Sequence, residues 1–158
     1  MKKVIVRLGN GLGNQLFTYA AAYSFAKKNN SKLFVDDESG FYKRYKYQLH
    51  NFNISAPIID KKFKFLGIGG RLKRRIFQKI DRFSKIKTFL LEKRDSEKFT
   101  CYDDNQFNVD FRKVMYFEGF FQSEKYFQEQ KENLVKEFAF KENIINQKNS
   151  LIDKIINE

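Results

Sequence analysis

The stretch "KKVIVRLGNGLGNQLFTYAAAYSFAKK", Lys2–Lys28, determines the fold class of this chain. It begins with a short β-branched run that suits a buried strand of a parallel sheet. Three of the eight glycines, Gly9, Gly11 and Gly13, then fall within five residues, and a helical pattern of apolar residues follows them. A second β-branched run, "SKLFVDD" at 31–37, comes next. Strand, glycine loop, helix and strand are typical of the start of a Rossmann-like α/β fold.

The rest of the chain predicts a strand and three helices. A basic stretch, Arg71–Arg94, has apolar residues at helical spacing: Leu72, Ile76, Ile80, Phe83 and Leu90. Residues 110–121 read as a strand and 123–138 as a helix, which we expect Ser123 to cap. A further amphipathic helix is expected at 142–158. We therefore expect one Rossmann-like domain at 1–141, with a basic helical insertion near 71–94.

Composition limits the class of protein. The 158 residues suffice for one domain, and with 42% apolar and 32% charged residues they resemble neither a disordered nor a membrane-spanning chain. The single cysteine, Cys101, excludes an internal disulfide and supplies no zinc set. No signal peptide follows Lys2 and Lys3, and we expect a cytoplasmic location.

The net charge of +12 is concentrated in one place. Arg71–Arg94 holds ten Lys or Arg and two acids, and therefore +8 of the total. Three interpretations stay open: a solvated outer face with the apolar stripe in the core, attraction to anionic lipid headgroups, or nucleic-acid binding. The first is the default. No nucleic-acid-binding module is recognisable, so no nucleic-acid partner is expected.

A glycine-rich turn between a strand and a helix lets main-chain amides approach an anion closely, although such glycines can also serve only a tight turn. Asn14 is a candidate N-cap, and its amide and that of Gln15 could hydrogen-bond a sugar or a diphosphate. A P-loop requires Gly-Lys-Ser/Thr and is excluded. The dinucleotide fingerprint is poorly matched because Asn14 stands at its third conserved position, although Asp36 lies about where the ribose-binding acid is expected.

Two motifs, in this order, carry a family resemblance. "GNGLGNQLFTYA" (Gly9–Ala20) and "YFEGFFQSEKYF" (Tyr116–Phe127), followed by "VKEFAFK" at 135–141, resemble the α-1,2-fucosyltransferases of glycosyltransferase family 11. The resemblance extends from the N-terminus to about residue 141, and the middle, 56–98, matches poorly. Asn10 stands where that family commonly has glycine, and Thr18 where it commonly has glutamine.

The resemblance implies an inverting enzyme that transfers L-fucose from GDP-fucose to the 2-hydroxyl of a galactoside acceptor. It also implies two Rossmann-like domains in the GT-B arrangement, no required metal, and a role in surface-glycan biosynthesis. Lipid-linked acceptors would place the enzyme at the inner face of the membrane, with Arg71–Arg94 as the contact. The His-x-Arg-Arg-x-Asp segment with which the family binds the diphosphate is not found in this chain. We therefore expect an N-terminal portion of such an enzyme, inactive alone, whose 142–158 helix leads toward a second, donor-binding domain.

The substrate-binding residues that we predict lie after two strands and at the start of the first helix. They are Arg7, Gly11, Gly13, Asn14, Gln15 and Gln122, and no catalytic residue is assigned. This prediction requires Asn14 and Gln15 to face an open groove. The alternative function is a non-catalytic glycan- or nucleotide-binding module.

Overall fold

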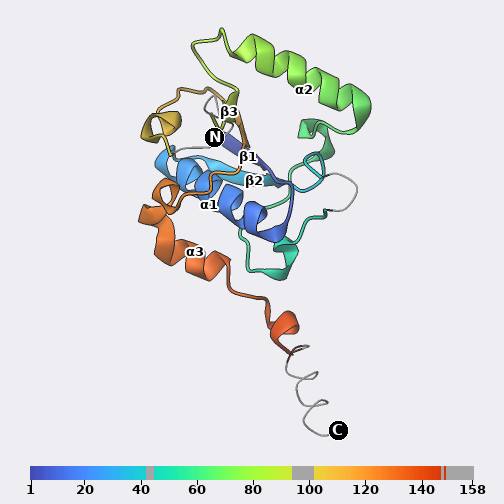
Figure 1. Ribbon diagram of the computed structural model, residues 1–158, viewed down its shortest axis with the longest axis vertical. Helices are drawn as coiled ribbons and strands as arrows, with labels where there is room; N and C mark the ends of the chain where they lie inside the picture. The colour runs from blue at the N-terminus through green and yellow to red at the C-terminus, as the bar shows by residue number, and fades with distance from the viewer. Residues whose placement is uncertain (42–44, 94–101, 147, 149–158) are drawn as a thin grey trace, which may run out of the picture.

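The structure is a computed structural model that describes residues 1–41, 45–93, 102–146 and 148. Its centre is a parallel sheet of four strands in the order β2-β1-β4-β3 (Figure 1). The strands are β1 (Lys3–Arg7), β2 (Lys32–Asp36), β3 (Phe89–Leu91) and β4 (Val114–Glu118). The helices are α1 (Leu12–Lys28), α2 (Gly67–Asp81) and α3 (Lys131–Glu137). The predicted α/β class is confirmed, whereas a two-domain arrangement stays a prediction.

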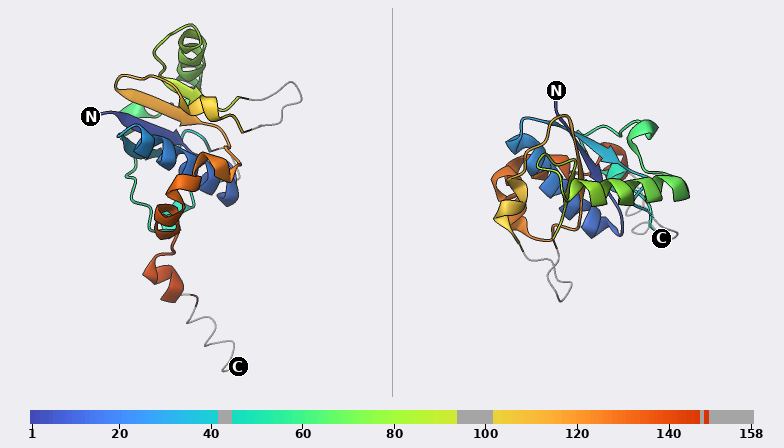
Figure 2. Two further views of the ribbon diagram at one scale, coloured as in Figure 1. Left: turned by 90° about the vertical axis from the view of Figure 1, so that its left-hand side faces the viewer. Right: turned by 90° about the horizontal axis from the view of Figure 1, so that it is seen from above.

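Both faces of the sheet are covered, which explains why the central strand β1 is apolar throughout. Val4, Ile5 and Val6 are all fully buried. On one face α1 contributes Phe25, whose ring packs against three further aromatic rings: Phe107, Phe111 and Phe117. On the other face the ring of Phe65 packs against Phe77, Phe89 and Tyr116. Figure 2 shows the sheet between α1 and α2.

The strand order creates a switch point between β1 and β4. The chain leaves β1 to form β2 on one side, and β3 and β4 lie on the other. Arg7 pairs with Asp36 of β2, and Leu91 of β3 pairs with Glu118 of β4, so the carboxyl ends of all four strands meet at one edge. In open parallel sheets, ligands bind in the crevice outside this point.

Two predicted element boundaries are wrong. Helix α1 is capped by Gly11 instead of Asn14. The main-chain amide of Gln15 already donates to the Gly11 carbonyl oxygen (3.1 Å), so the helix begins before Asn14. Residues 124–126 and 128–130 form separate 3₁₀ turns ahead of α3, and the Ser123 side chain makes no capping bond. Residues 142–146 are helical. The rest of the predicted closing helix except residue 148, and Cys101, lie outside the described residues.

The basic stretch also contains a strand that its helical spacing concealed. Helix α2 ends at Asp81, whose carboxylate accepts hydrogen bonds from the Thr88 and Phe89 amides (2.7 and 3.2 Å). These bonds turn the chain from the helix into β3, so Leu90 is a buried strand residue. None of the helices in the described residues is long and apolar enough to cross a membrane.

Candidate functional site

A polar crevice of about 330 Å³ opens at the carboxyl ends of β1 and β4. It lies at the switch point, where an open parallel sheet is expected to bind its ligand. The loop after β1, the inner side of α2 and the turn after β4 form its walls. The polar side chains that line it are Arg7, Asn10, Thr18, Arg74, Gln78, Glu92 and Glu118.

Glu118, the last residue of β4, is the central charge of the crevice. It is only 8% exposed. Its Oε2 contacts the Arg74 guanidinium at 2.5 Å and the Arg7 guanidinium at 3.7 Å, and it accepts from Gln78 Nε2 at 3.2 Å. Among the described residues its Oε1 has no hydrogen-bond partner, although it is buried. A buried carboxylate oxygen without a partner is costly, and it is available to accept a hydrogen bond from a ligand.

Burial raises the pKa of the Glu118 carboxyl above its ordinary value, because desolvation disfavours the charged form. The neighbouring Arg7 and Arg74 guanidiniums act in the opposite direction and lower it only in part. A carboxyl with a raised pKa is a better proton acceptor than an ordinary surface glutamate. Such groups concentrate at functional sites.

Arg7 belongs to this crevice, as predicted for a residue at the end of β1. Its Nε donates to Ser39 Oγ (3.1 Å) and its Nη2 to the Ser39 carbonyl oxygen (2.6 Å). Ser39 is in turn hydrogen-bonded to the carboxylate of Asp36. These contacts hold the Arg7 side chain, 13% exposed, beside Glu118.

Asp36 is therefore a structural acid. It is 1% exposed, and its oxygens accept from the amides of Glu38 (3.1 Å) and Ser39 (2.9 Å) and from the Ser39 hydroxyl. With three hydrogen bonds inside the protein and 1% exposure, this carboxylate is not accessible to a ribose hydroxyl in this structure. The structure thus removes the one feature that favoured a dinucleotide site.

Gln15 is buried and does not face an open groove, so the requirement stated for it as a substrate-binding residue is not met. It is fully buried, its Nε2 donates to the carbonyl oxygens of Asn10 and Lys46 (2.9 Å each), and its Oε1 accepts from the Gln48 amide (2.9 Å). All the hydrogen-bonding capacity of its amide nitrogen is used. In this geometry Gln15 holds residues 46–48 against the glycine loop, and it reaches a ligand only through the loop that it positions.

Asn14 and Gln122, in contrast, come together on the surface although 108 residues separate them. Gln122 Nε2 donates to Asn14 Oδ1 at 2.7 Å. They lie next to the crevice, since Thr18 Oγ1 is within hydrogen-bond distance of the Asn14 carbonyl oxygen (2.8 Å) and the Gly119 carbonyl oxygen (2.9 Å). The two predicted carboxamides therefore form one exposed polar pair at the start of α1.

Gly11 and Gly13 leave open space at the start of α1. A Cβ at Gly13 would have nothing within 4 Å, and one at Gly11 would only touch the Tyr45 ring at 3.8 Å. Neither has a positive φ. Packing and backbone geometry therefore do not require glycine at these two positions, and the close approach of a ligand to the bare backbone there stays a prediction.

We expect Gln15→Ala to destabilise the chain by about 2 kcal/mol, because two carbonyl groups and one amide lose their partners in a buried position. Urea denaturation measures this loss. Hydrogen exchange at the Gln48 amide should accelerate in the same variant. Gln48→Ala is the matched control, since its own side chain is exposed and only its main chain takes part. A Gln15→Ala variant as stable as this control would contradict the positioning role.

The sequence alone did not identify Glu118, Arg74, Gln78 and Glu92. Glu118 directly precedes the second motif's glycine at the end of a predicted strand, and that position could have singled it out. The default prediction placed the polar face of the basic helix in solvent, whereas the Arg74 side chain points to the sheet and is 14% exposed. The carboxylate of Glu92 accepts from the Phe120 and Phe121 amides (2.6 and 2.8 Å) and so fixes the turn after β4.

A larger hollow, about 530 Å³, lies away from the strand ends between α1 and the 124–130 turns. Tyr102, next to residues that the structure does not describe, forms part of its wall. It contains none of the predicted site residues. In the described residues no three His, Cys, Asp or Glu side chains gather as a metal site. We therefore take the crevice around Glu118 as the candidate site.

The fold and the crevice define a Rossmann-like α/β domain with a polar site at the switch point of a parallel sheet. In sequence the chain is similar to an α-1,2-colitosyltransferase of Escherichia coli, with 34% identity over 139 residues, which are 85% of this chain and 44% of that protein. The chain thus spans less than half the length of this relative. No protein-family model and no solved structure matches the chain. The similarity supports a relationship to glycosyltransferases.

Proposed function

We propose that this chain is the acceptor-side domain of an α-1,2-glycosyltransferase that transfers L-fucose, or a closely related deoxy sugar, from a GDP-activated donor to a galactoside. The observation that carries the proposal is the similarity to the colitosyltransferase over 139 residues, which are 85% of this chain. Colitose is L-fucose without its 3-hydroxyl, so the two sugars demand nearly the same site. We further propose an inverting, metal-independent reaction in surface-glycan synthesis at the cytoplasmic face of the membrane.

The crevice has the chemistry that an acceptor hydroxyl requires. In an inverting transfer the attacking hydroxyl loses its proton as the bond to the donor sugar forms. Glu118, with a raised pKa and an unpartnered Oε1, is placed to take that proton. Arg7 and Arg74 fix the orientation of its carboxylate. The exposed Asn14–Gln122 pair can bind further hydroxyls of the acceptor.

The departing GDP develops negative charge that cations or aligned amides must stabilise. Both arginines of the crevice already contact Glu118. We therefore propose that a second domain of the complete enzyme binds the diphosphate, facing the open amides near Gly11 and Gly13. In that arrangement the chain described here binds the galactoside acceptor and supplies the proton acceptor.

The test uses the complete protein with radiolabelled GDP-L-fucose, GDP-colitose and a β-galactoside acceptor. We expect transfer from at least one of the two donors and no product with the 2-deoxygalactoside, which lacks the attacking hydroxyl. If the site hydrogen-bonds the donor's 3-hydroxyl, colitose transfer should be slower by about 10²-fold or more. Transfer to the 2-deoxy acceptor would refute the linkage, and transfer from neither donor would refute the donor class.

A non-catalytic glycan-binding module is the second candidate. It is favoured by the observation that Arg7 and Arg74 both contact Glu118, which leaves the crevice without an unpaired cation among its lining residues. Calorimetry of the chain with galactosides and with GDP separates the two functions. Galactoside binding that is unaffected by GDP, without transfer by the complete protein, would favour the module.

A further inference from the structure

Helix α2 has its polar side toward the protein and its apolar side toward solvent. Arg74 and Gln78 reach inward to Glu118, and Asp81 accepts from the amides that begin β3. An apolar row at helical spacing runs along the exposed side of the helix and ends two residues after it: Ile68, Leu72, Ile76, Ile80 and Phe83. Leu72 is 59%, Ile80 63% and Phe83 92% exposed.

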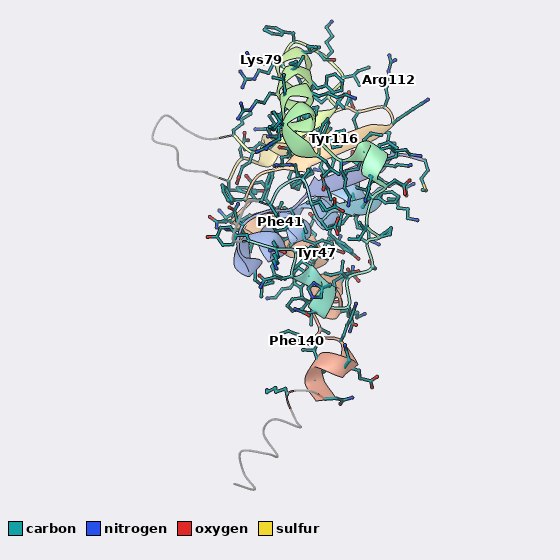
Figure 3. All side chains as sticks on the ribbon, turned by 90° about the vertical axis from the view of Figure 1, so that its right-hand side faces the viewer. Phe41, Tyr47, Lys79, Arg112, Tyr116 and Phe140 are labelled. Atoms are coloured by element: carbon teal, nitrogen blue, oxygen red, sulfur yellow. The ribbon has the colours of Figure 1, made fainter. Side chains whose placement is uncertain are left out.

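This orientation reverses the default prediction, in which the apolar stripe faced the core. The physical reason is that the face of the sheet below α2 is already covered by the rings of Phe65, Phe89 and Tyr116. Helix α2 adds one ring to this cluster, that of Phe77, which packs against Phe65. Figures 1 and 2 show α2 at the outer edge of the molecule, away from α3. Figure 3 shows Tyr116 below the helix that carries Lys79.

Within residues 67–87, exposed cations border the apolar row and no exposed acid does. Residues 67–87 contain eight Lys or Arg and a single acid, Asp81, which is buried. The exposed cations near the row are Arg71, Lys73, Arg75, Lys79, Arg82 and Lys85. An apolar stripe flanked by Lys and Arg is the pattern of a helix that lies in the plane of an anionic bilayer surface. Exposed apolar patches of this kind mark interaction sites.

We propose that α2 and the turn to Lys87 dock the protein on an anionic membrane surface. The apolar row inserts at the level of the headgroups and upper acyl chains, and the flanking cations contact the lipid phosphates. The same helix supplies Arg74 and Gln78 to the crevice wall, so docking brings the candidate site close to the bilayer. The charge beside the apolar row selects lipid over an uncharged protein groove, because the exposed cations need anions next to an apolar surface.

The test measures binding of the full chain to vesicles of phosphatidylcholine alone and with phosphatidylglycerol, by co-sedimentation at increasing salt. We expect binding that requires the anionic lipid and weakens with salt. The triple variant Lys73→Gln/Lys79→Gln/Lys85→Gln should lower partitioning roughly 100-fold. The charge-matched control, Lys131→Gln/Lys136→Gln/Lys141→Gln, changes exposed lysines at the α3 end and should bind as the unmodified chain does.

A tryptophan reporter tests insertion separately from charge. The chain has no tryptophan, so Phe83→Trp and Val135→Trp each create a single one, on the α2 side and on α3. Acyl chains brominated near the headgroup should quench the Phe83→Trp protein and leave the Val135→Trp protein unchanged. Leu72→Ser/Phe83→Ser should weaken binding at least about tenfold without changing the unfolding midpoint, because both residues are exposed.

Three results would overturn the proposal. One is equal binding to neutral and anionic vesicles, and another is equal quenching of the two tryptophans. The third is burial of the Phe83→Trp side chain without vesicles, in a concentration-dependent manner, which would assign the row to a second copy of the chain or to another domain of the complete protein.

Discussion

Glu118→Gln should lower glycosyl transfer by the complete enzyme by about 10²- to 10⁴-fold, while the chain stays folded. The substitution keeps the shape of the side chain and an oxygen that can accept from Arg74, but it removes the proton acceptor. Initial rates with saturating donor and acceptor measure the loss. Glu124→Gln, an exposed carboxylate in the turn after β4, is the control and should retain activity.

Two further measurements separate a catalytic role of Glu118 from a structural one. Glu118→Ala should cost about 3–5 kcal/mol of stability, because Arg7 and Arg74 lose their carboxylate while only 13% and 14% exposed. The glutamine variant should be much closer to the unmodified chain. If Glu118→Gln transfers sugar at the normal rate, the carboxylate is structural only.

The pH dependence follows from the direction of the pKa shift. The Glu118 pKa is raised by burial, so the folded state binds a proton more tightly than the unfolded state. The stability that this group contributes is present below its ordinary pKa, and it is lost as the pH rises through the raised value. As the pH falls through that window, the free energy of unfolding of the unmodified chain should therefore rise relative to that of Glu118→Gln. Urea denaturation of both chains measures the difference. Transfer should fall over the same window, because the protonated carboxyl cannot act as a base.

The sheet was largely predictable because each of its signals is local. β1, β2 and β4 stand out as short apolar or β-branched runs, and α1 follows the glycine loop directly. β3 was missed because it has only three residues, and Leu90 continued the spacing of the preceding helix. Two hydrogen bonds that the Asp81 carboxylate accepts decide that boundary, and no periodicity reveals them.

The site was less predictable, because it depends on contacts between distant segments. Periodicity shows that α2 has two faces, but the packing of Phe65 decides which face is inside. The same is true of the two carboxamides at the start of α1. Asn14 and Gln15 are adjacent in sequence, and their side chains leave the helix in directions about a quarter of a turn apart. Asn14 therefore meets Gln122 on the surface, whereas Gln15 is buried. Glu118 becomes notable only when the parallel register places Arg7 beside it.

Gly40→Ala should destabilise the chain by about 3 kcal/mol or more, because the glycine loop passes directly over residue 40. A Cβ at Gly40 would lie 1.9 Å from the Leu8 carbonyl oxygen, and one at Gly9 would lie 2.6 Å from the Gly40 carbonyl oxygen. Both obstacles are main-chain atoms, so no side-chain rotation relieves the overlap. Separating the two segments would also pull Ser39 away from Arg7 and disturb the carboxylate cluster of the crevice.

Gly13→Ala is the matched comparison, and the two variants together test why the loop is rich in glycine. At Gly13 a Cβ meets open space, so alanine should stabilise α1 by roughly 0.5–1 kcal/mol, since glycine is the poorer helix former. Thermal unfolding should therefore move in opposite directions in the two variants. If Gly13→Ala also weakens donor use by the complete enzyme, the glycine serves the ligand and not the fold. A Gly13→Ala enzyme with unchanged kinetics would contradict close approach of substrate to this backbone, and equal unfolding of Gly40→Ala and the unmodified chain would contradict the tight crossing.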